Sequence, residues 1–227
     1  MSEALEPGQA AIPRRAYRSP RREQQAAETR DAVLAAAGRL FAEAGWARTG
    51  MRDIAREAGV AVETVYANFR SKGELLAAAN DAAVVGDTLE VPLADRAEFR
   101  ALAAGDLGSR AAAAARLVTD IHRRTAGLHR ALTHAAGTDD ALVAELRAIE
   151  ERRRTSVGQG AELVAGRPVD DRAVAGLAAV LSSEVYLLLT GMSGLSDGQY
   201  ESWVADTVLR LLAEPAAPAP APGTTAR

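Results

Sequence analysis

Apolar residues recur at intervals of three and four positions through most of this chain. That spacing puts them on one face of an α-helix, whereas a half-buried strand would alternate apolar and polar residues. We find no persuasive alternation with β-branched residues, so a sheet is not expected. The pattern therefore predicts an all-α protein.

The first third of the chain predicts short helices that end at glycines. Gly45 and Gly59 are the expected stops, because glycine readily takes the left-handed conformation that follows a helix. Ser71 is a natural N-cap, and Glu74, three positions on, completes a capping box. The expected helices cover about residues 28–44, 51–58, 62–69 and 71–86.

Longer helices are expected in the rest of the chain, where segments that combine glycine with an acidic cap separate them. They cover about residues 109–136, 139–165, 170–190 and 197–213, with a further short helix within 94–104. The arm and the tail defined below lack periodicity and are expected to be disordered. The chain thus divides into a basic arm (1–24), a head (25–70), a body (71–213, with 71–86 as connecting helix) and a Pro/Ala tail (214–227).

Composition excludes several classes of protein. The chain has 227 residues, a net charge of −3 and no cysteine, so disulfides and thiolate metal sites are ruled out. No apolar run reaches the roughly 20 residues of a membrane span, and the N-terminus has no apolar core of a secretory signal. A cytoplasmic location is therefore expected, without membrane contact.

The charge is unevenly distributed. Residues 14–72 hold 12 Arg/Lys against 7 Asp/Glu, whereas residues 73–227 hold 15 against 21. A basic N-terminal part on an acidic chain suggests contact with a polyanion such as nucleic acid. Chance clustering in an arginine-rich tail is the alternative.

The stretch "IAREAGVAVETVY" has the spacing of a helix-turn-helix. Ala55 is small enough for two helices to cross closely, and Gly59 permits the sharp turn between them. Val60 and Val65 then pack with Ile54 and fix the angle between the helices. In such a motif the second helix enters the major groove of DNA, although a helical hairpin without DNA contact would show the same spacing.

The side chains of the second helix fit that role. Asn68 can read adenine, Thr64 can contact a base or a thymine methyl group, and Glu63 can accept from cytosine N4. Tyr66 and Lys72 are suited to contact phosphates. Lys72 also lies beside the N-terminus of the next helix, whose backbone N–H groups bind anions.

Four linked motifs carry a resemblance to a known family. They are "LF-x-x-x-G" at 40–45, "DIA-x-x-A-G-V" at 53–60, "T-V-Y-x-x-F" at 64–69 and "K-x-x-L" at 72–75. Residues 29–76 thereby resemble the N-terminal domain of the tetracycline-repressor (TetR) family of transcriptional regulators. The resemblance implies a three-helix helix-turn-helix DNA-binding domain and a C-terminal helical domain that dimerises and often binds a small effector.

Carried over by position, the resemblance places base-facing or groove-facing residues at Val62, Glu63, Thr64, Ala67 and Asn68. It places phosphate contacts at Arg48, Thr49, Tyr66 and Lys72, and assigns Phe41 and Phe69 to the core. Gly50 departs from the family, which commonly has Ser or Thr there as a cap. The absence of Arg, Lys or Gln at positions 62, 63 and 67 disfavours guanine readout by this helix.

The arm is the other candidate for DNA contact. Its arginines are Arg14, Arg15, Arg18, Arg21 and Arg22. Arms of other helix-turn-helix proteins follow the backbone or enter the minor groove. A solubilising tail is the alternative.

Catalytic and metal chemistry find no support in the sequence. His122, His129 and His134 lack the Glu-x-x-His spacing of a helical metal site, so hydrogen-bonded structural histidines are expected. No nucleophile elbow, P-loop or GxGxxG is present. We therefore expect no catalytic residues, no cofactor and no metal.

The last two helices carry apolar stripes wider than one packed face requires. Burial within one protomer is one explanation, but we favour a four-helix interface between two copies, as the resemblance also implies. The expected interface residues are Leu177, Val180, Leu181, Val185, Leu188, Trp203, Val204, Val208 and Leu211.

An effector pocket is expected among the middle helices, without a multi-ring cage because aromatic residues are scarce there. Its polar floor would come from His122, Arg123 or Glu184. The other candidate lining residues are Leu117, Ile121, Leu128, Leu146, Ile149 and Tyr186.

These expectations combine into a homodimeric repressor that a small molecule releases from a palindromic DNA operator. An activator or architectural DNA-binding protein without an effector is the first alternative. A helical enzyme or protein-interaction module that binds no DNA is the second. The sequence does not identify the effector.

Overall fold

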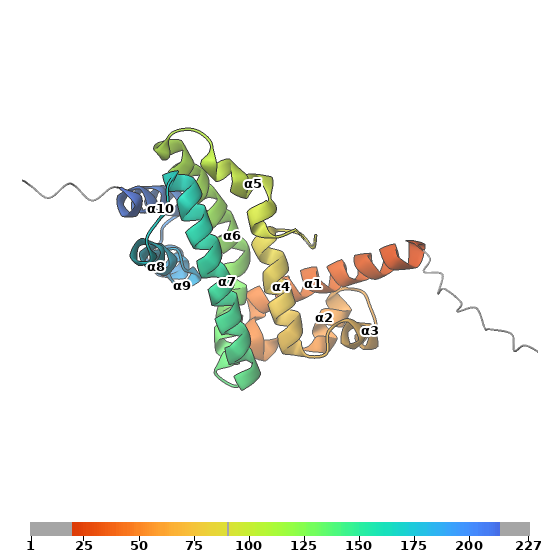
Figure 1. Ribbon diagram of the computed structural model, residues 1–227. Coiled ribbons are helices and arrows are strands. Elements are labelled where there is room, and N and C mark those ends of the chain that lie inside the picture. Colours follow the sequence, from red (N-terminus) through yellow and green to blue (C-terminus); the bar gives the residue numbers. More distant parts are fainter. Residues whose placement is uncertain (1–19, 90, 214–227) are drawn as a thin grey trace, which may run out of the picture.

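The computed structural model describes residues 20–89 and 91–213, and all regular elements in these ranges are helical (Figure 1). The all-α expectation is confirmed. The predicted tail and residues 1–19 of the predicted arm, with Arg14, Arg15 and Arg18, lie outside the described residues.

The head and connecting helix comprise α1 (Pro20–Arg48), α2 (Met51–Glu57), α3 (Val62–Asn68) and α4 (Lys72–Val85). The rest of the body comprises α5 (Ala97–Arg100) between the 3₁₀ turns η1 (Leu93–Asp95) and η2 (Ala101–Ala103), α6 (Leu107–Ala136), α7 (Asp140–Ala165), α8 (Asp171–Val180), α9 (Ser183–Leu187), the π-helical turn η3 (Leu188–Met192) and α10 (Asp197–Leu212).

Helix α1 is longer at its start than the sequence pattern predicted. It begins at Pro20, so residues 20–24, which we had placed in a disordered arm, are helical. Proline is favoured at the first helical position, and Glu23 in the first turn complements the helix dipole. The regular helix ends where expected, because Gly45 has φ 76°.

The head packs around four fully or almost fully buried side chains. They are Phe41, Ile54, Val65 and Phe69, and the expected core positions of both phenylalanines are confirmed. The same core continues into α4 and α6. Helix α6 packs against α1, α4, α7, α9 and α10, so it contacts both the head and most of the body (Figure 1).

Head and body approach each other closely at Gly127. A Cβ atom built there would lie 3.0 Å from the Ala42 Cα and 2.9 Å from the Ala42 Cβ. Helices α1 and α6 therefore cross in backbone contact, which only glycine permits at this position.

The helix expected over residues 170–190 is interrupted. Helix α8 ends at Val180 and α9 begins at Ser183, with the Ser182 hydroxyl accepting from the Val185 N–H. Arg153 from α7 compensates the break, since its Nη1 donates to the carbonyls of Ala178 and Leu181 at 2.9 and 3.1 Å. A second local correction concerns Glu74, whose carboxylate accepts from the Arg70 N–H rather than completing a box with the Ser71 N–H.

The segment Asp171–Met192 has the length and the apolar composition needed to cross a membrane. This corrects our expectation that no apolar run in the chain is long enough for a membrane span. Only 22% of its most apolar window is buried. The break at residue 181 and the charged Glu184 within it are both unfavourable in a lipid bilayer. Its exposed apolar surface instead fits a contact with protein.

Candidate DNA-binding surface and ligand cavity

The turn between α2 and α3 has the geometry that the spacing predicted. Gly59 has φ 68°, and the Val60 N–H donates to the Ala55 carbonyl at 3.0 Å. Ala55 and Val65 are buried on opposite sides of this turn. These contacts fix the angle at which α3 leaves the head.

Helix α3 presents a small polar face to solvent. Glu63 and Ala67 are exposed, and Tyr66 is 53% exposed. Val62, Thr64 and Asn68, which were also predicted to face DNA, are only half-buried or partly covered. The Asn68 amide nitrogen donates one of its two hydrogens to the Thr64 carbonyl at 2.8 Å, which holds the side chain against α3 and leaves its oxygen and one N–H for other partners.

Thr49 does not occupy the position we predicted for it. Its side chain is buried, and its hydroxyl lies 2.9 Å from the Gly45 carbonyl and 3.1 Å from the Leu40 carbonyl. The hydroxyl satisfies backbone carbonyls left free where α1 ends. Thr49 therefore stabilises the end of α1 instead of facing phosphate.

The two predicted phosphate-binding cations are anchored to the end of the same helix. The Lys72 ammonium donates to the Trp46 carbonyl at 2.5 Å and lies 3.9 Å from the centre of the Trp46 ring. Burial lowers the pKa of Lys72. Arg48 donates through Nε to the Ala44 carbonyl. Each side chain keeps further N–H donors for a phosphate.

Two exposed arginines close to α3 were missed by the sequence reasoning. Arg52 lies in the first turn of α2, and Arg70 follows the end of α3. Both are exposed. Their position beside the ends of the helix-turn-helix was the available signal, and it suits phosphate contact.

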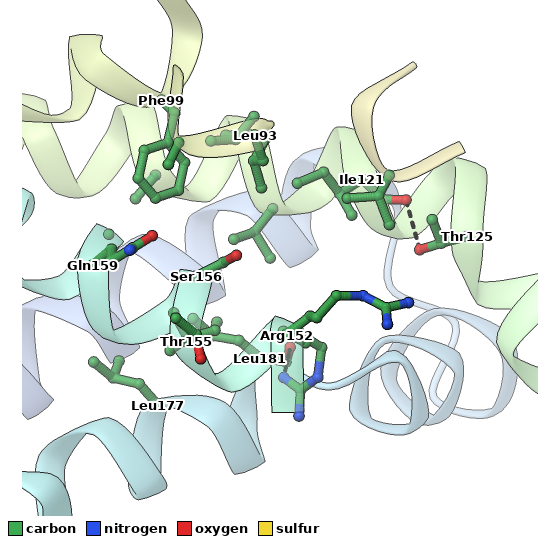
Figure 2. Close-up of a pocket in the computed structure, with 18 of the residues that line it drawn as sticks. Leu93, Phe99, Ile121, Thr125, Arg152, Thr155, Ser156, Gln159, Leu177 and Leu181 are labelled. Atoms are coloured by element: carbon green, nitrogen blue, oxygen red, sulfur yellow. Dashed lines mark hydrogen bonds between the residues drawn. The ribbon is translucent and has the colours of Figure 1, made fainter. Parts of the chain in front are cut away.

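A cavity of about 640 Å³ lies in the body. Figure 2 shows Leu93 and Phe99 above it, Ile121 on α6, and Leu177 on α8 below. Helix α7 supplies Arg152, Thr155, Ser156 and Gln159, and α4 supplies Asn80, Asp81, Val84 and Val85. A mostly apolar cavity of this size with a few polar groups is typical of a small-molecule site.

The structure brings together four of the predicted pocket residues, namely Leu117, Ile121, His122 and Ile149. The others lie elsewhere. Leu128 and Leu146 belong to the core shared by head and body, and Tyr186 packs 4.9 Å from the ring of Tyr200. Arg123 pairs with Asp197, and Glu184 pairs with the lining residue His129, but neither Arg123 nor Glu184 lies in the lining itself. The sequence reasoning missed Phe99, Leu102, Arg152, Ser156, Gln159 and the α4 residues, whose positions depend on how the helices cross.

His122 is a buried neutral group at the wall of the cavity. Its Nδ1 lies 3.0 Å from the Tyr200 hydroxyl, and the ring is also within 5.4 Å of Tyr186. Burial, with a smaller contribution from the positive charge of Arg153, lowers the pKa of His122 to about 4. Burial also raises the pKa of Tyr200. Both side chains are therefore uncharged near pH 7.

The predicted dimer-interface residues divide into two groups. Leu177, Leu181, Val204 and Val208 are buried within the protomer, which corrects their assignment to the interface. Three of these, Leu177, Leu181 and Val208, line the cavity. The remaining predicted residues keep exposed surface: Val180, Val185, Leu188, Trp203 and Leu211. Met192, 82% exposed, was missed.

The head with its exposed α3, joined to a helical body with an apolar cavity, defines the class of helix-turn-helix regulators. Residues 33–79 match the family model described as "Bacterial regulatory proteins, tetR family". The head therefore matches the DNA-binding domain of the TetR family of transcriptional regulators.

Solved structures of this family share the fold. A protein from Rhodococcus sp. described as a TetR-family transcriptional regulator is 17% identical, with a TM-score of 0.62, over 82% of this chain and 100% of that one. A TetR-family member from Streptomyces coelicolor A3 is 24% identical, with a TM-score of 0.55, over 81% and 98%. The multidrug binding protein EbrR, solved with ethidium, is 22% identical, with a TM-score of 0.54, over 81% and 98%. No match was found among curated proteins.

Proposed function

We propose that this chain is a homodimeric transcriptional repressor that a small molecule in the cavity releases from a palindromic DNA operator. The observation that carries the proposal is the path of α4. Its first residue, Lys72, contacts the end of α1 in the head, and its last two turns line the cavity. A ligand that changes the position of α4 thereby changes the position of the DNA-binding head.

The DNA contacts would come from the exposed face of α3 and the cations around it. Glu63, Ala67 and Asn68 would face base edges, whereas Tyr66, Arg48 and Lys72 would contact phosphates. In a two-fold dimer the two copies of α3 would occupy half-sites about 34–36 Å apart. The described part of the arm, with Arg21 and Arg22 exposed at the start of α1, would add phosphate contacts.

The dimer would bury the exposed apolar side chains of the α8–α10 region. Leu188 is 50% exposed and Leu211 is 38% exposed in the single protomer. Contiguous exposed apolar surface typically marks an interface. Two copies of one surface related by a two-fold axis would match the symmetry of a palindromic operator. The proposed dimer acts in the cytoplasm and catalyses no reaction.

The effector would be a largely apolar small molecule. EbrR, which shares the fold, is described as a multidrug binding protein in complex with ethidium. In this chain the cavity walls are mostly aliphatic, with Phe99, His122 and His129 as the aromatic groups among the described lining residues. The ligand can weaken DNA binding only as far as it prefers the state with displaced heads.

Footprinting on DNA that flanks the gene, followed by anisotropy titration of the protected sequence, tests the proposal. Tyr66→Ala is expected to weaken binding about equally on all sequences, and Asn68→Ala to relax preference at one base pair. Exposed Glu151→Ala on α7 serves as the control and leaves binding unchanged. Unchanged DNA affinity in both α3 variants would rule out α3 as the reader.

An activator or architectural protein without an effector is the alternative function. A screen for compounds that raise the melting temperature distinguishes it. The repressor requires that at least one stabilising compound also lowers DNA affinity. If compounds bind but leave DNA affinity unchanged, the alternative is favoured.

A further inference from the structure

The cavity has one polar side on an otherwise apolar wall. Arg152, Thr155, Ser156 and Gln159 lie on the side of α7 that lines the cavity (Figure 2). We call these four residues the polar row. With a rise of 1.5 Å per residue, it extends along about 10 Å of helix. A ligand that matches it is elongated, with polar groups at one edge or end and an apolar remainder.

Arg152 is the cation of the polar row with free hydrogen-bonding capacity. Its neighbour Arg153 is fully engaged, donating to Glu150 and to the carbonyls of Ala178 and Leu181. Arg152 donates to Asp81 through Nη2 alone, at 3.1 and 3.4 Å, and Nη2 lies 3.6 Å from Glu145. Within the described chain, its Nε and Nη1 make no hydrogen bond. Both two-nitrogen forks of the guanidinium, Nη1 with Nη2 and Nε with Nη2, include the nitrogen that Asp81 occupies, so a ligand carboxylate gains a two-nitrogen contact by displacing Asp81.

The Arg152–Asp81 pair is easily exchanged. Both side chains are more than half exposed, at 53% and 56%, and solvent-exposed ion pairs add little to stability. The charges at the cavity are balanced, since Asp81 and Glu150 face Arg152 and Arg153. An added anion is therefore accommodated best when it takes the place of one of these carboxylates.

We propose that the effector is an elongated apolar carboxylic acid whose carboxylate replaces Asp81 on Arg152. This inference rests on the proposed function of the cavity as the effector site. The carboxylate accepts from Nη2 of Arg152, which Asp81 leaves, and from the free Nε or Nη1 beside it. The apolar chain lies against Phe99, Ile121 and Leu177. Ser156 and Gln159, which make no side-chain hydrogen bond within the described residues, offer donors to any further oxygen atoms of the ligand.

The exchange would couple the ligand to α4. Two arginines hold the C-terminal part of this helix: Arg152 through Asp81, and Arg124 of α6 through the carbonyls of Ala83 and Val84 at 2.7 and 3.1 Å. When the ligand takes Arg152, the side-chain link between α4 and α7 is lost and the link to α6 stays. Helix α4, and the head with it, is then free to move relative to α7.

Calorimetric titration of the full chain with decanoate, decanol and decylammonium tests the chemistry of the ligand. Decanoate is expected to bind about tenfold more tightly than decanol, in line with one charged hydrogen-bonded contact. Arg152→Gln should abolish this preference, whereas Arg154→Gln, an exposed residue of the same helix outside the lining, should retain it. Equal binding of acid and alcohol, stronger binding of the amine, or binding of none of the three would overturn the inference.

Asp81→Asn tests the exchange independently. Removing the competing carboxylate should strengthen decanoate binding roughly threefold and leave decanol binding unchanged. Unchanged or weaker decanoate binding would show that Asp81 is not displaced. DNA binding by ligand-free protein is measured in parallel. If the protein binds DNA and responds only to neutral compounds, the proposed function holds and the inference about a carboxylic acid is wrong.

Discussion

At the scale of single residues, Gly59 sets the angle between α2 and α3. Its φ of 68° is strained for any residue with a side chain, yet a Cβ there would have no neighbour within 4 Å. Gly59→Ala should therefore lower the free energy of unfolding by about 1–2 kcal/mol through backbone strain alone. Urea unfolding followed by circular dichroism measures this.

Gly38 provides the matched control for that substitution. It lies inside α1 with an ordinary helical backbone, and a Cβ there also has no neighbour within 4 Å. Gly38→Ala should raise the free energy of unfolding by about 0.5–1 kcal/mol, because alanine is the better helix former. If Gly59→Ala and Gly38→Ala changed the free energy of unfolding in the same direction, the assigned role of the Gly59 turn would be contradicted.

His122 makes stability depend on pH. In the folded state burial lowers its pKa to about 4 from 6.5, so the unfolded chain binds more protons between these two values. Stability is therefore highest above pH 6.5 and falls by about 3 kcal/mol as the pH drops to 4. His122→Gln should remove this part of the pH dependence, measured by urea unfolding at pH 7 and pH 4.5.

Exposed His134, at the end of the same helix, controls for the general effect of acid. His134→Gln should keep the pH dependence of the original chain. An equally steep loss of stability in the His122→Gln variant would show that another group is responsible.

At the scale of helices, local signals sufficed for the head. Gly45, Gly59 and Ser71 end or begin helices through their own backbone and side-chain chemistry, so their neighbours in sequence determine the result. The break at residue 181 could not be predicted in this way, because Arg153, 25 to 28 positions away, satisfies the freed carbonyls.

The candidate site could not be predicted in full from local sequence signals either. Periodicity identified Leu177 and Leu181 as one-sided apolar positions, but it carries no information on what that side faces. The structure turns both toward the cavity and the core, whereas Leu188, in the same stripe, faces solvent. The break between α8 and α9 is what separates their directions.

The crossing of α1 and α6 offers a test of how the head is held. Gly127→Ala would bring a methyl group to 3.0 Å from the Ala42 backbone, which cannot yield as a flexible side chain would. We expect a loss of roughly 1–3 kcal/mol in unfolding free energy from overpacking. Gly158→Ala in α7, whose nearest neighbour would be Val174 at 3.6 Å, should stabilise instead. Equal effects at the two glycines in thermal unfolding would contradict a tight crossing.

At the scale of the whole molecule, the proposed dimer makes DNA affinity depend on a surface far from α3. Leu188→Glu adds a charge to a side chain that is 50% exposed in the protomer and proposed to be buried by the partner. We expect it to weaken the dimer by roughly 2 kcal/mol per protomer, as for a central interface residue, without unfolding the chain. Sedimentation velocity and circular dichroism measure the two effects separately.

The DNA-binding consequence follows from symmetry. A dimer engages both half-sites of a palindrome, whereas the dissociated Leu188→Glu protomer engages one, so affinity for the full operator should fall to that for a half-site. Leu89→Glu, which alters a 66% exposed leucine outside α8–α10, should leave both dimer and operator binding intact. If Leu188→Glu dissociates the dimer but operator affinity is unchanged, each head binds alone, and the spacing between heads cannot be what an effector controls.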